Sequence, residues 1–214
     1  MQLLSINTGQ KQPILNAKKT GATGIYKTPV QGPVEISTAG LPGDAICDVE
    51  NHGGADQAVY VYTTPDYAWW SAELGTELAP GTFGENLTID EIESAHLCIG
   101  DCLHIGAVTL QVTAPRVPCV TLATRMDDPF FVKRFRAAER PGVYCRVLQA
   151  GAIQAGATVI LAPYAGATVT VLEMFRDFYT PDLTAATIRR YLAAPLAIRA
   201  RTSKEEQARK LQIG

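Results

Sequence analysis

The sequence predicts a mainly β fold followed by a short all-helical segment. Short runs rich in β-branched and aromatic residues recur as far as about Pro163, and Gly, Pro or Asp separates them. After Gly166 the apolar residues recur at helical spacing instead. Many short strands with glycine-containing turns favour a barrel or a sandwich. We therefore predict a β domain over residues 1–163 and a C-terminal three-helix domain over residues 164–214.

The predicted strands share a β-rich pattern with turn residues at their ends. They are Leu3–Ile6, Ala58–Tyr62, Cys102–Ile105, Val108–Val112, Val143–Val147 and Thr158–Leu161. Gly106 lies between two of these runs and predicts a hairpin.

A few short helices are also predicted between the strands. Thr64-Pro65 opens the first, which ends at Gly75 and carries aromatic residues that we expect in the core. Asp128-Pro129 opens the second, whose basic side we expect to be solvated.

Three helices are predicted in the C-terminal segment. Thr170-x-x-Glu173 is a capping box for the first, Thr180-Pro181 opens the second, and the third contains Thr202-x-x-Glu205. The apolar face of the first helix includes Leu172, Phe175 and Phe178. Helices this short need tertiary packing, so we expect them to cover the β domain or a second subunit in a homodimer.

Composition bounds the class of protein. The chain has 214 residues, 47% of them hydrophobic, and is long enough to bury a core. The formal net charge of −2 disfavours nucleic-acid or membrane binding as the main role. The N-terminus lacks a signal-peptide pattern and no stretch is long and apolar enough to span a bilayer, so a cytoplasmic protein is expected.

The cysteine pattern argues against a disulfide scaffold or a metal cluster. Five cysteines are an odd number, and Cys98 and Cys102 stand four apart without a further pair to complete a zinc or iron–sulfur set. A redox function would therefore need electrons from another protein. Pyridoxal phosphate is not expected either.

A thiol that follows two closely spaced prolines is the most informative feature of the chain. In Pro115-Arg116-Val117-Pro118-Cys119 the prolines stiffen the backbone, so the position of Cys119 is controlled. Arg116 favours the thiolate, the form that attacks electrophiles and binds soft metals. A metal-binding or reactive cysteine is predicted, and a small buried cysteine is the alternative.

Two glycine-flanked polar segments accompany this thiol. The first places His52 beside two glycines, which permit close backbone approach to a ligand, with Asp56 shortly after it. The second surrounds Glu85 and Asn86 with glycines. Each segment alone could be an ordinary turn, but their repetition indicates a binding pocket.

Taken in order, these segments resemble the MOSC domain, the module shared by the C-termini of molybdenum-cofactor sulfurases, and within it the stand-alone bacterial YiiM type. The match runs through most of the chain. Its motifs are Thr23-Gly24-Ile25-Tyr26-Lys27 with Pro29-Val30, Leu41-Pro42-Gly43-Asp44, His52-Gly53-Gly54 with Asp56, Gly84-Glu85-Asn86-Leu87, Ile99-Gly100-Asp101 and Pro115-Arg116-Val117-Pro118-Cys119. The resemblance implies a β-barrel that binds molybdenum cofactor, and Cys119 matches the family cysteine proposed to ligate molybdenum.

The resemblance also implies an activity: reduction of N-hydroxylated compounds, such as hydroxylamine derivatives of purine-like bases, with electrons from an external reductase. The cofactor is a pterin dithiolene with a terminal phosphate, so its site needs a thiolate, cations and amide or carboxylate partners. We assign Cys119 as the ligand of molybdenum, Lys27 and Arg116 as anion contacts or electrostatic tuners, and His52, Asp56, Glu85 and Asn86 as residues that orient the cofactor or relay protons. The predicted catalytic residues are Cys119, His52 and Lys27.

Alternatives remain for these residues and for the function. Lys27 could equally be a solvated lysine, and Glu85 could simply hold a loop together. A cofactor carrier or sulfur-transfer module would bind molybdopterin without turnover. A cysteine hydrolase would use Cys119 with His52 and an acid, although a proline-fixed thiol is expected to lack the helix N-terminus that often activates such nucleophiles.

Overall fold

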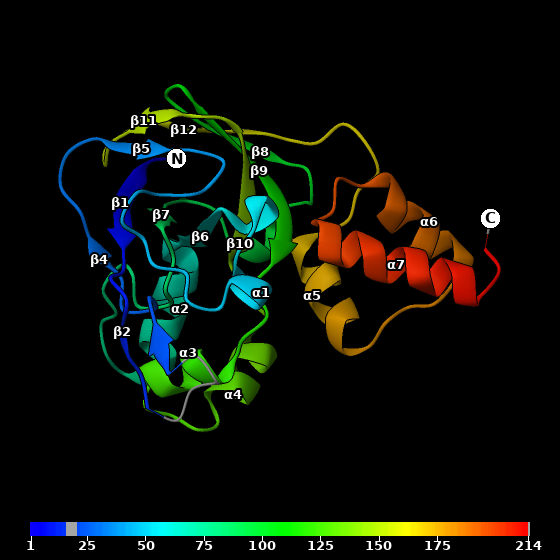
Figure 1. The fold of residues 1–214 in the computed structure, drawn as a ribbon, viewed down its shortest axis with the longest axis horizontal. Helices are drawn as coiled ribbons and strands as arrows, with labels where there is room; N and C mark the ends of the chain where they lie inside the picture. The colour runs from blue at the N-terminus through cyan, green and yellow to red at the C-terminus, as the bar shows by residue number, and fades with distance from the viewer. Residues whose placement is uncertain (16–20, 214) are drawn as a thin grey trace.

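The computed structural model describes residues 1–15 and 21–213. A strand-rich body stands beside a smaller helical body, which consists of the three helices between Val171 and Lys210 (Figure 1). The strands are β1 (Leu3–Thr8), β2 (Gln12–Pro13), β3 (Ala22–Thr23), β4 (Thr28–Pro29), β5 (Val34–Ile36), β6 (Val59–Thr63), β7 (Leu87–Ile89), β8 (Cys102–Ile105), β9 (Val108–Pro115), β10 (Val143–Gln149), β11 (Gly151–Ile153) and β12 (Val159–Ala162). The helices are α1 (Val49–His52), α2 (Thr64–Leu74), α3 (Val120–Arg125), α4 (Phe131–Ala138), α5 (Val171–Tyr179), α6 (Ala185–Ala193) and α7 (Ile198–Lys210), with short 3-10 helices η1 (Ala55–Gln57) and η2 (Ser94–His96).

In the described part of the chain, the main sheet has eight strands in the order β12-β8-β9-β10-β6-β7-β1-β4. β6 and β7 run parallel, and α2 lies in the connection that such a pair requires. The other neighbours in this sheet are antiparallel, including the predicted hairpin of β8 and β9 around Gly106. Two small ribbons, β11-β5 and β2-β3, complete the strand pairing.

The sheet curls until its two ends approach each other, but it is not closed into a barrel. Gln2, just before β1, bridges Thr158, just before β12. The Leu3 N–H also donates to the Ala157 carbonyl at 2.9 Å. From Asn7 onward β1 pairs with β4, so no continuous ladder joins β1 to β12 in the described residues. The predicted mainly β fold is confirmed, whereas the barrel is a curled sheet whose ends meet at an isolated bridge.

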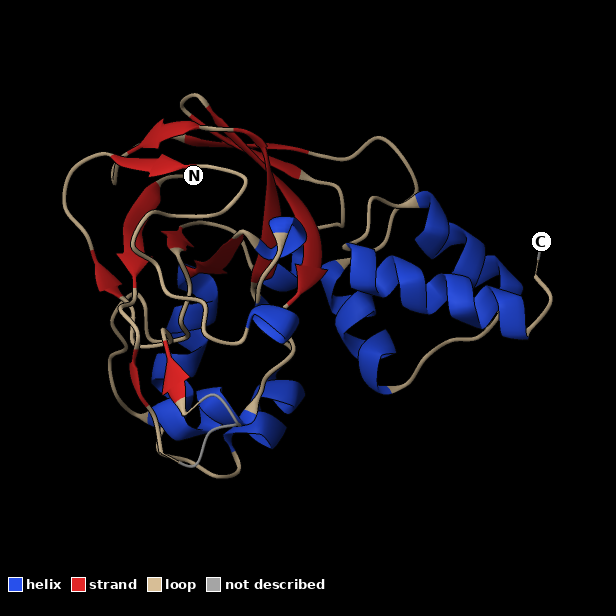
Figure 2. Ribbon diagram, viewed as in Figure 1, coloured by secondary structure: helices blue, strands red, loops and turns tan. Residues whose placement is uncertain are grey.

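The helices α2 to α4 lie beside the strands of the sheet (Figure 2). An aromatic cluster joins side chains of these helices to side chains of β6 and β10. Trp70 of α2 is fully buried, and its ring centroid lies 4.9 Å from that of Phe131 in α4 and 5.8 Å from that of Phe83. Leu122 of α3 is buried in the same cluster. Because each large buried side chain contributes about 1.5–3 kcal/mol, the cluster fixes α3 firmly against the sheet.

Several predicted helix boundaries are corrected by the structure. α3 lies outside the predicted elements, and its start at Val120 lacks the polar capping residue that usually marks a helix in sequence. α6 begins after Thr184 rather than at Pro181. The Asp182 carboxylate accepts a hydrogen bond from the Thr184 N–H at 2.9 Å, and the Thr184 hydroxyl caps the helix by accepting from the Thr187 N–H. Thr202 lies inside α7 and caps nothing.

α5 attaches the helical body to the sheet through its first turns. The Thr170 hydroxyl caps it by accepting from the Glu173 N–H at 3.0 Å, as predicted. Val171 and Phe175 are buried, and the Val171 N–H donates to the Leu97 carbonyl at 2.8 Å. Phe178 is 60% exposed, because the docking contacts lie at the start of α5 and this residue is in the last turn. The predicted covered face therefore includes Phe175 but not Phe178.

No helix within residues 1–15 and 21–213 combines the length and the apolar character that crossing a membrane requires.

Two phenylalanines of α5 provide a test of this docking. Phe175→Ala should lower the free energy of unfolding by about 3–5 kcal/mol, because the side chain is 1% exposed and its loss leaves a cavity. Phe178→Ala, on the same helix, should change it by no more than about 0.5 kcal/mol. Denaturant titration of both variants measures the difference, and equal effects would show that α5 does not dock as described.

Candidate functional site

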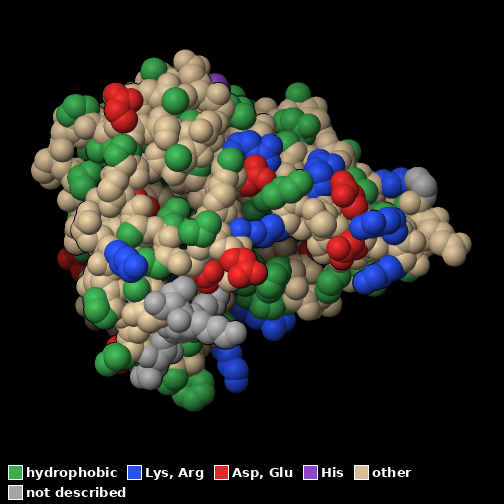
Figure 3. All heavy atoms as spheres, viewed as in Figure 1, with side chains coloured by type: hydrophobic (Ala, Val, Ile, Leu, Met, Phe, Trp, Pro, Cys, Tyr) green, Lys and Arg blue, Asp and Glu red, His purple; other side chains and the backbone are tan. Residues whose placement is uncertain are grey.

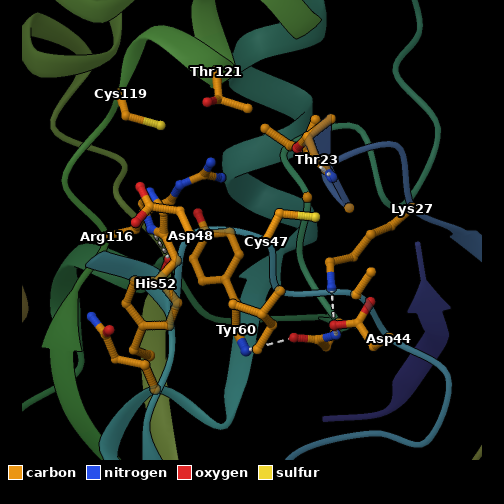
Figure 4. A pocket seen from close by; sticks show the side chains of 18 of the residues that line it. Thr23, Lys27, Asp44, Cys47, Asp48, His52, Tyr60, Arg116, Cys119 and Thr121 are labelled. Carbon is orange, nitrogen blue, oxygen red and sulfur yellow. Dashed lines mark hydrogen bonds and ion pairs between the residues drawn. The ribbon is translucent and has the colours of Figure 1, made fainter. Parts of the chain in front are cut away.

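A pocket opens where β3 and the residues that follow it, the loop around α1 and the ends of β6, β9 and β10 meet (Figure 4). The structure brings five of the predicted site residues into its lining. They are Lys27, His52, Asn86, Arg116 and Cys119. The pocket thus combines a thiol, an imidazole, an amide and two cationic groups.

Cys119 lies at the N-cap of α3, so the expectation that this thiol lacks a helix N-terminus is wrong. The reason is the direction of proline's effect. Pro118 disfavours helix for the residue before it, Val117, and leaves the residues after Cys119 free to become helical.

The environment of Cys119 makes its thiol acidic. Burial alone would raise the pKa of the thiol, but a hydrogen bond with His52, the positive charges of Arg116 and His52, and the Leu122 N–H together lower the pKa to about 6. At neutral pH most of the thiol is therefore ionised, and the thiolate is the form that binds soft metals and attacks electrophiles.

His52 is held between this thiol and a tyrosine. It is the last residue of α1, and its Nδ1 lies 3.2 Å from the hydroxyl oxygen of Tyr144 in β10. Tyr144 is buried, and burial raises the pKa of its hydroxyl, which stays protonated at neutral pH. The hydroxyl therefore fixes the orientation of the imidazole without adding charge.

Arg116 supplies a buried positive charge beside Cys119. Its side chain is 4% exposed, its Nη1 donates to the Phe83 carbonyl, and its guanidinium carbon lies 5.0 Å from the ring centroid of Tyr60. Its Nε is buried without a hydrogen-bond acceptor among the described residues. Arg116 thus has a donor to spare for a ligand.

Lys27 is not a solvated lysine. It is buried and forms an ion pair with Asp44. Burial lowers the pKa of Lys27, and the Asp44 charge opposes that shift. Asp44 also accepts from the Gly9 N–H at 2.9 Å and from Nδ2 of Asn86 at 2.9 Å. Lys27 and Asn86 therefore line the pocket as parts of one buried network.

Two of the predicted pocket residues lie outside the lining. Glu85 accepts hydrogen bonds from the Tyr67 hydroxyl at 2.6 Å and from the Gly81 N–H at 2.6 Å, so its carboxyl group supports the loop that precedes β7. Asp56 forms an ion pair with Arg146 of β10 at 2.9 Å. The geometry favours structural roles for both residues.

Several lining residues are not identified by sequence reasoning. They are Asp44, Cys47, Asp48, Tyr60, Thr121 and Tyr144. Asp44 stands in the motif Leu41-Pro42-Gly43-Asp44, which could have marked it. The two tyrosines look like core residues of strands, and no local signal separates them from the core.

These features define a mainly β protein that presents an acidic thiol inside a pocket lined by cations. The chain belongs to the MOSC domain family, whose family model matches residues 48–160. This family takes its name from the C-terminal domain of molybdenum cofactor sulfurases.

Similar proteins place the chain near the YiiM type within this family. It is 36% identical over 159 residues to the uncharacterized protein YflK of Bacillus subtilis, covering 74% of this chain and 72% of YflK. It is 37% identical over 164 residues to a protein of Gibberella moniliformis named Reductase, covering 74% of this chain but 29% of that protein. The crystal structure of YiiM from Geobacillus stearothermophilus superposes with a TM-score of 0.79 at 28% identity, covering 96% of this chain and 98% of that one.

The acidity of Cys119 predicts a distinctive alkylation profile. The rate of labelling by iodoacetamide should rise as the pH passes about 6 and level off above it, since only the thiolate reacts. Cys98 should titrate at higher pH, because burial raises the pKa of its thiol. In His52→Ala the midpoint for Cys119 should move upward, because the variant removes a hydrogen bond to the thiolate. Peptide mass spectrometry assigns each label, and a Cys119 profile with a midpoint near that of Cys98 would contradict the description.

Proposed function

We propose that the chain binds molybdenum cofactor through the Cys119 thiolate and reduces N-hydroxylated compounds with electrons from a separate reductase. The observation that carries this proposal is the pocket in which Cys119 lies together with Lys27 and Arg116. The pKa of the thiol, about 6, agrees with it, because it supplies a soft anionic ligand at neutral pH. Membership of the MOSC family supports the choice of cofactor. The similar protein named Reductase supports the class of reaction.

The donors of the pocket fit the parts of the cofactor. The Cys119 thiolate would hold the metal. The unpaired Nε–H of Arg116 and the buried ammonium of Lys27 would meet the phosphate or the heterocycle, which both offer acceptors. The Asn86 side chain lines the same wall and is already oriented by the Tyr60 N–H, which donates to its Oδ1 at 3.0 Å.

The reaction balances as two electrons and two protons added to an N-hydroxyl group, which yields the amine and water. Molybdenum held by Cys119 would supply the two-electron chemistry, and the electrons would come from the separate reductase. The chain supplies proton handling. His52 lies in the pocket, and an imidazole can hold or release a proton near neutral pH. The Tyr144 hydroxyl keeps the ring in place while it does so.

The N-cap position of Cys119 favours a second candidate, a cysteine hydrolase. A thiolate paired with an imidazole at the start of a helix is also the arrangement that activates nucleophilic cysteines. A hydrolase needs no molybdenum, so the metal content of natively expressed protein separates the two functions. A carrier module would hold the cofactor but show no turnover with a reductase present.

The Cys119→Ser variant tests the assignment of the ligand. A hydroxyl is a harder and much less acidic ligand, so the purified variant should lose most of its molybdenum and its reduction of a hydroxylamino base, while keeping its thermal midpoint. Metal analysis and turnover measure both effects.

Cys98→Ser is the matched control, because Cys98 is a half-buried thiol outside the pocket lining. It should retain molybdenum and turnover. Undiminished molybdenum in Cys119→Ser would contradict the assignment and direct attention to Cys47, the other thiol that lines the pocket.

A further inference from the structure

The helix that ends at His52 is too short to persist without outside support. α1 spans four residues, and isolated helices of this length are unstable in water. At its start, the Asp48 carboxylate accepts a hydrogen bond from the Asn51 N–H at 3.2 Å. At its end, the last carbonyl groups have no donors within the helix and need partners from elsewhere.

These partners come from the helical body. Arg199, in the first turn of α7, donates from Nη1 to the Asn51 carbonyl at 2.7 Å. From Nη2 it donates to the Gly53 carbonyl at 3.1 Å and to the Val49 carbonyl at 3.3 Å. A guanidinium suits this task, because its donors form a rigid planar fork. One side chain of α7 therefore binds the carbonyl groups on both sides of His52.

The start of α7 is itself hydrogen-bonded to the sheet and to η1, the 3-10 helix that follows α1. The Ala197 N–H donates to the Thr113 carbonyl of β9 at 3.1 Å. The Ile198 N–H donates to Oδ2 of Asp56 at 2.6 Å, and Asp56 is paired with Arg146 of β10. On the face shown in Figure 3, charged side chains of both signs gather over the helical body and its junction with the sheet. The backbone that carries Arg199 is thus held directly beside the loop.

We propose that Arg199 is a positioning residue for His52, and that the C-terminal helical body thereby holds the imidazole in the pocket that the Cys119 thiol also lines. The contacts run from α7 to the carbonyls that flank His52 and from His52 to Tyr144. The imidazole and the thiol line the same pocket (Figure 4). This inference goes beyond the proposed function, because it concerns how the fold places His52 and holds with or without a bound cofactor.

Other ionisable groups also line the pocket that contains the thiol. They are Lys27, Asp44, Cys47, Asp48, Tyr60, Arg116 and Tyr144. An Arg199→Ala substitution removes none of these groups. A changed titration of Cys119 in this variant therefore reports the loss of the guanidinium and of its hydrogen bonds.

The experiment compares the pH dependence of Cys119 alkylation in Arg199→Ala with that of the unaltered protein. The midpoint should rise by about half a pH unit or more, so that labelling at pH 6 falls about twofold or more. Arg199→Lys keeps the positive charge but loses the planar fork of donors. Its midpoint should therefore lie between those of the unaltered protein and Arg199→Ala.

Arg201→Ala is the matched control on the same helix. Arg201 donates to the carbonyls of Leu192 at 3.0 Å and Ala194 at 2.7 Å, so its contacts stay within the helical body. This variant should keep the unaltered profile. An equal shift in Arg201→Ala would overturn the proposal, because the effect would then come from a general loosening of the helices.

A double variant separates positioning from direct electrostatics. In a His52→Ala background, Arg199→Ala should cause no further shift, because the residue through which it acts is already gone. A full additional shift would mean that the Arg199 charge acts directly on the thiolate, and would overturn the positioning role. An unaltered profile in the single Arg199→Ala variant would overturn it as well.

Discussion

A buried carboxylate, that of Asp44, holds together one side of the pocket. It pairs with Lys27 and accepts hydrogen bonds from the Gly9 N–H and the Asn86 amide, so it joins three segments that are distant in sequence. Removing one partner of a buried ion pair costs about 3–5 kcal/mol, which keeps these segments in register. The backbones also meet closely here: a Cβ on Gly9 would lie 2.1 Å from the Gly24 carbonyl oxygen. This side is therefore rigid and preorganised.

The thiol side of the pocket depends on weaker local structure. Cys119 caps a six-residue helix, and His52 ends a four-residue helix. Both positions gain their definition from tertiary contacts: the aromatic cluster holds α3, and α7 holds the loop of His52. Changes outside the pocket can therefore alter the acidity of the Cys119 thiol. The position of Lys27 depends instead on its ion pair with Asp44 inside the pocket.

The sequence could predict six of the twelve described strands, the hairpin at Gly106 and the cap at Thr170, because each depends on local periodicity or turn chemistry. It could also predict that Cys119 and His52 belong to the candidate site. It could not predict that Asp56 supports the helical body, or that a tyrosine of β10 orients His52, because these contacts join residues far apart in the chain. The sequence could not predict that the barrel stays open for the same reason, since closure needs a ladder between β1 and β12, which are far apart in the chain.

Selenium in place of the Cys119 sulfur offers the most direct test that this residue ligates molybdenum. Selenocysteine preserves the geometry and the soft anionic character of the ligand. X-ray absorption at the selenium edge, recorded on cofactor-loaded protein, should show a molybdenum neighbour bonded to selenium. A protein that holds molybdenum while its selenium has only carbon as a bonded neighbour would contradict the account.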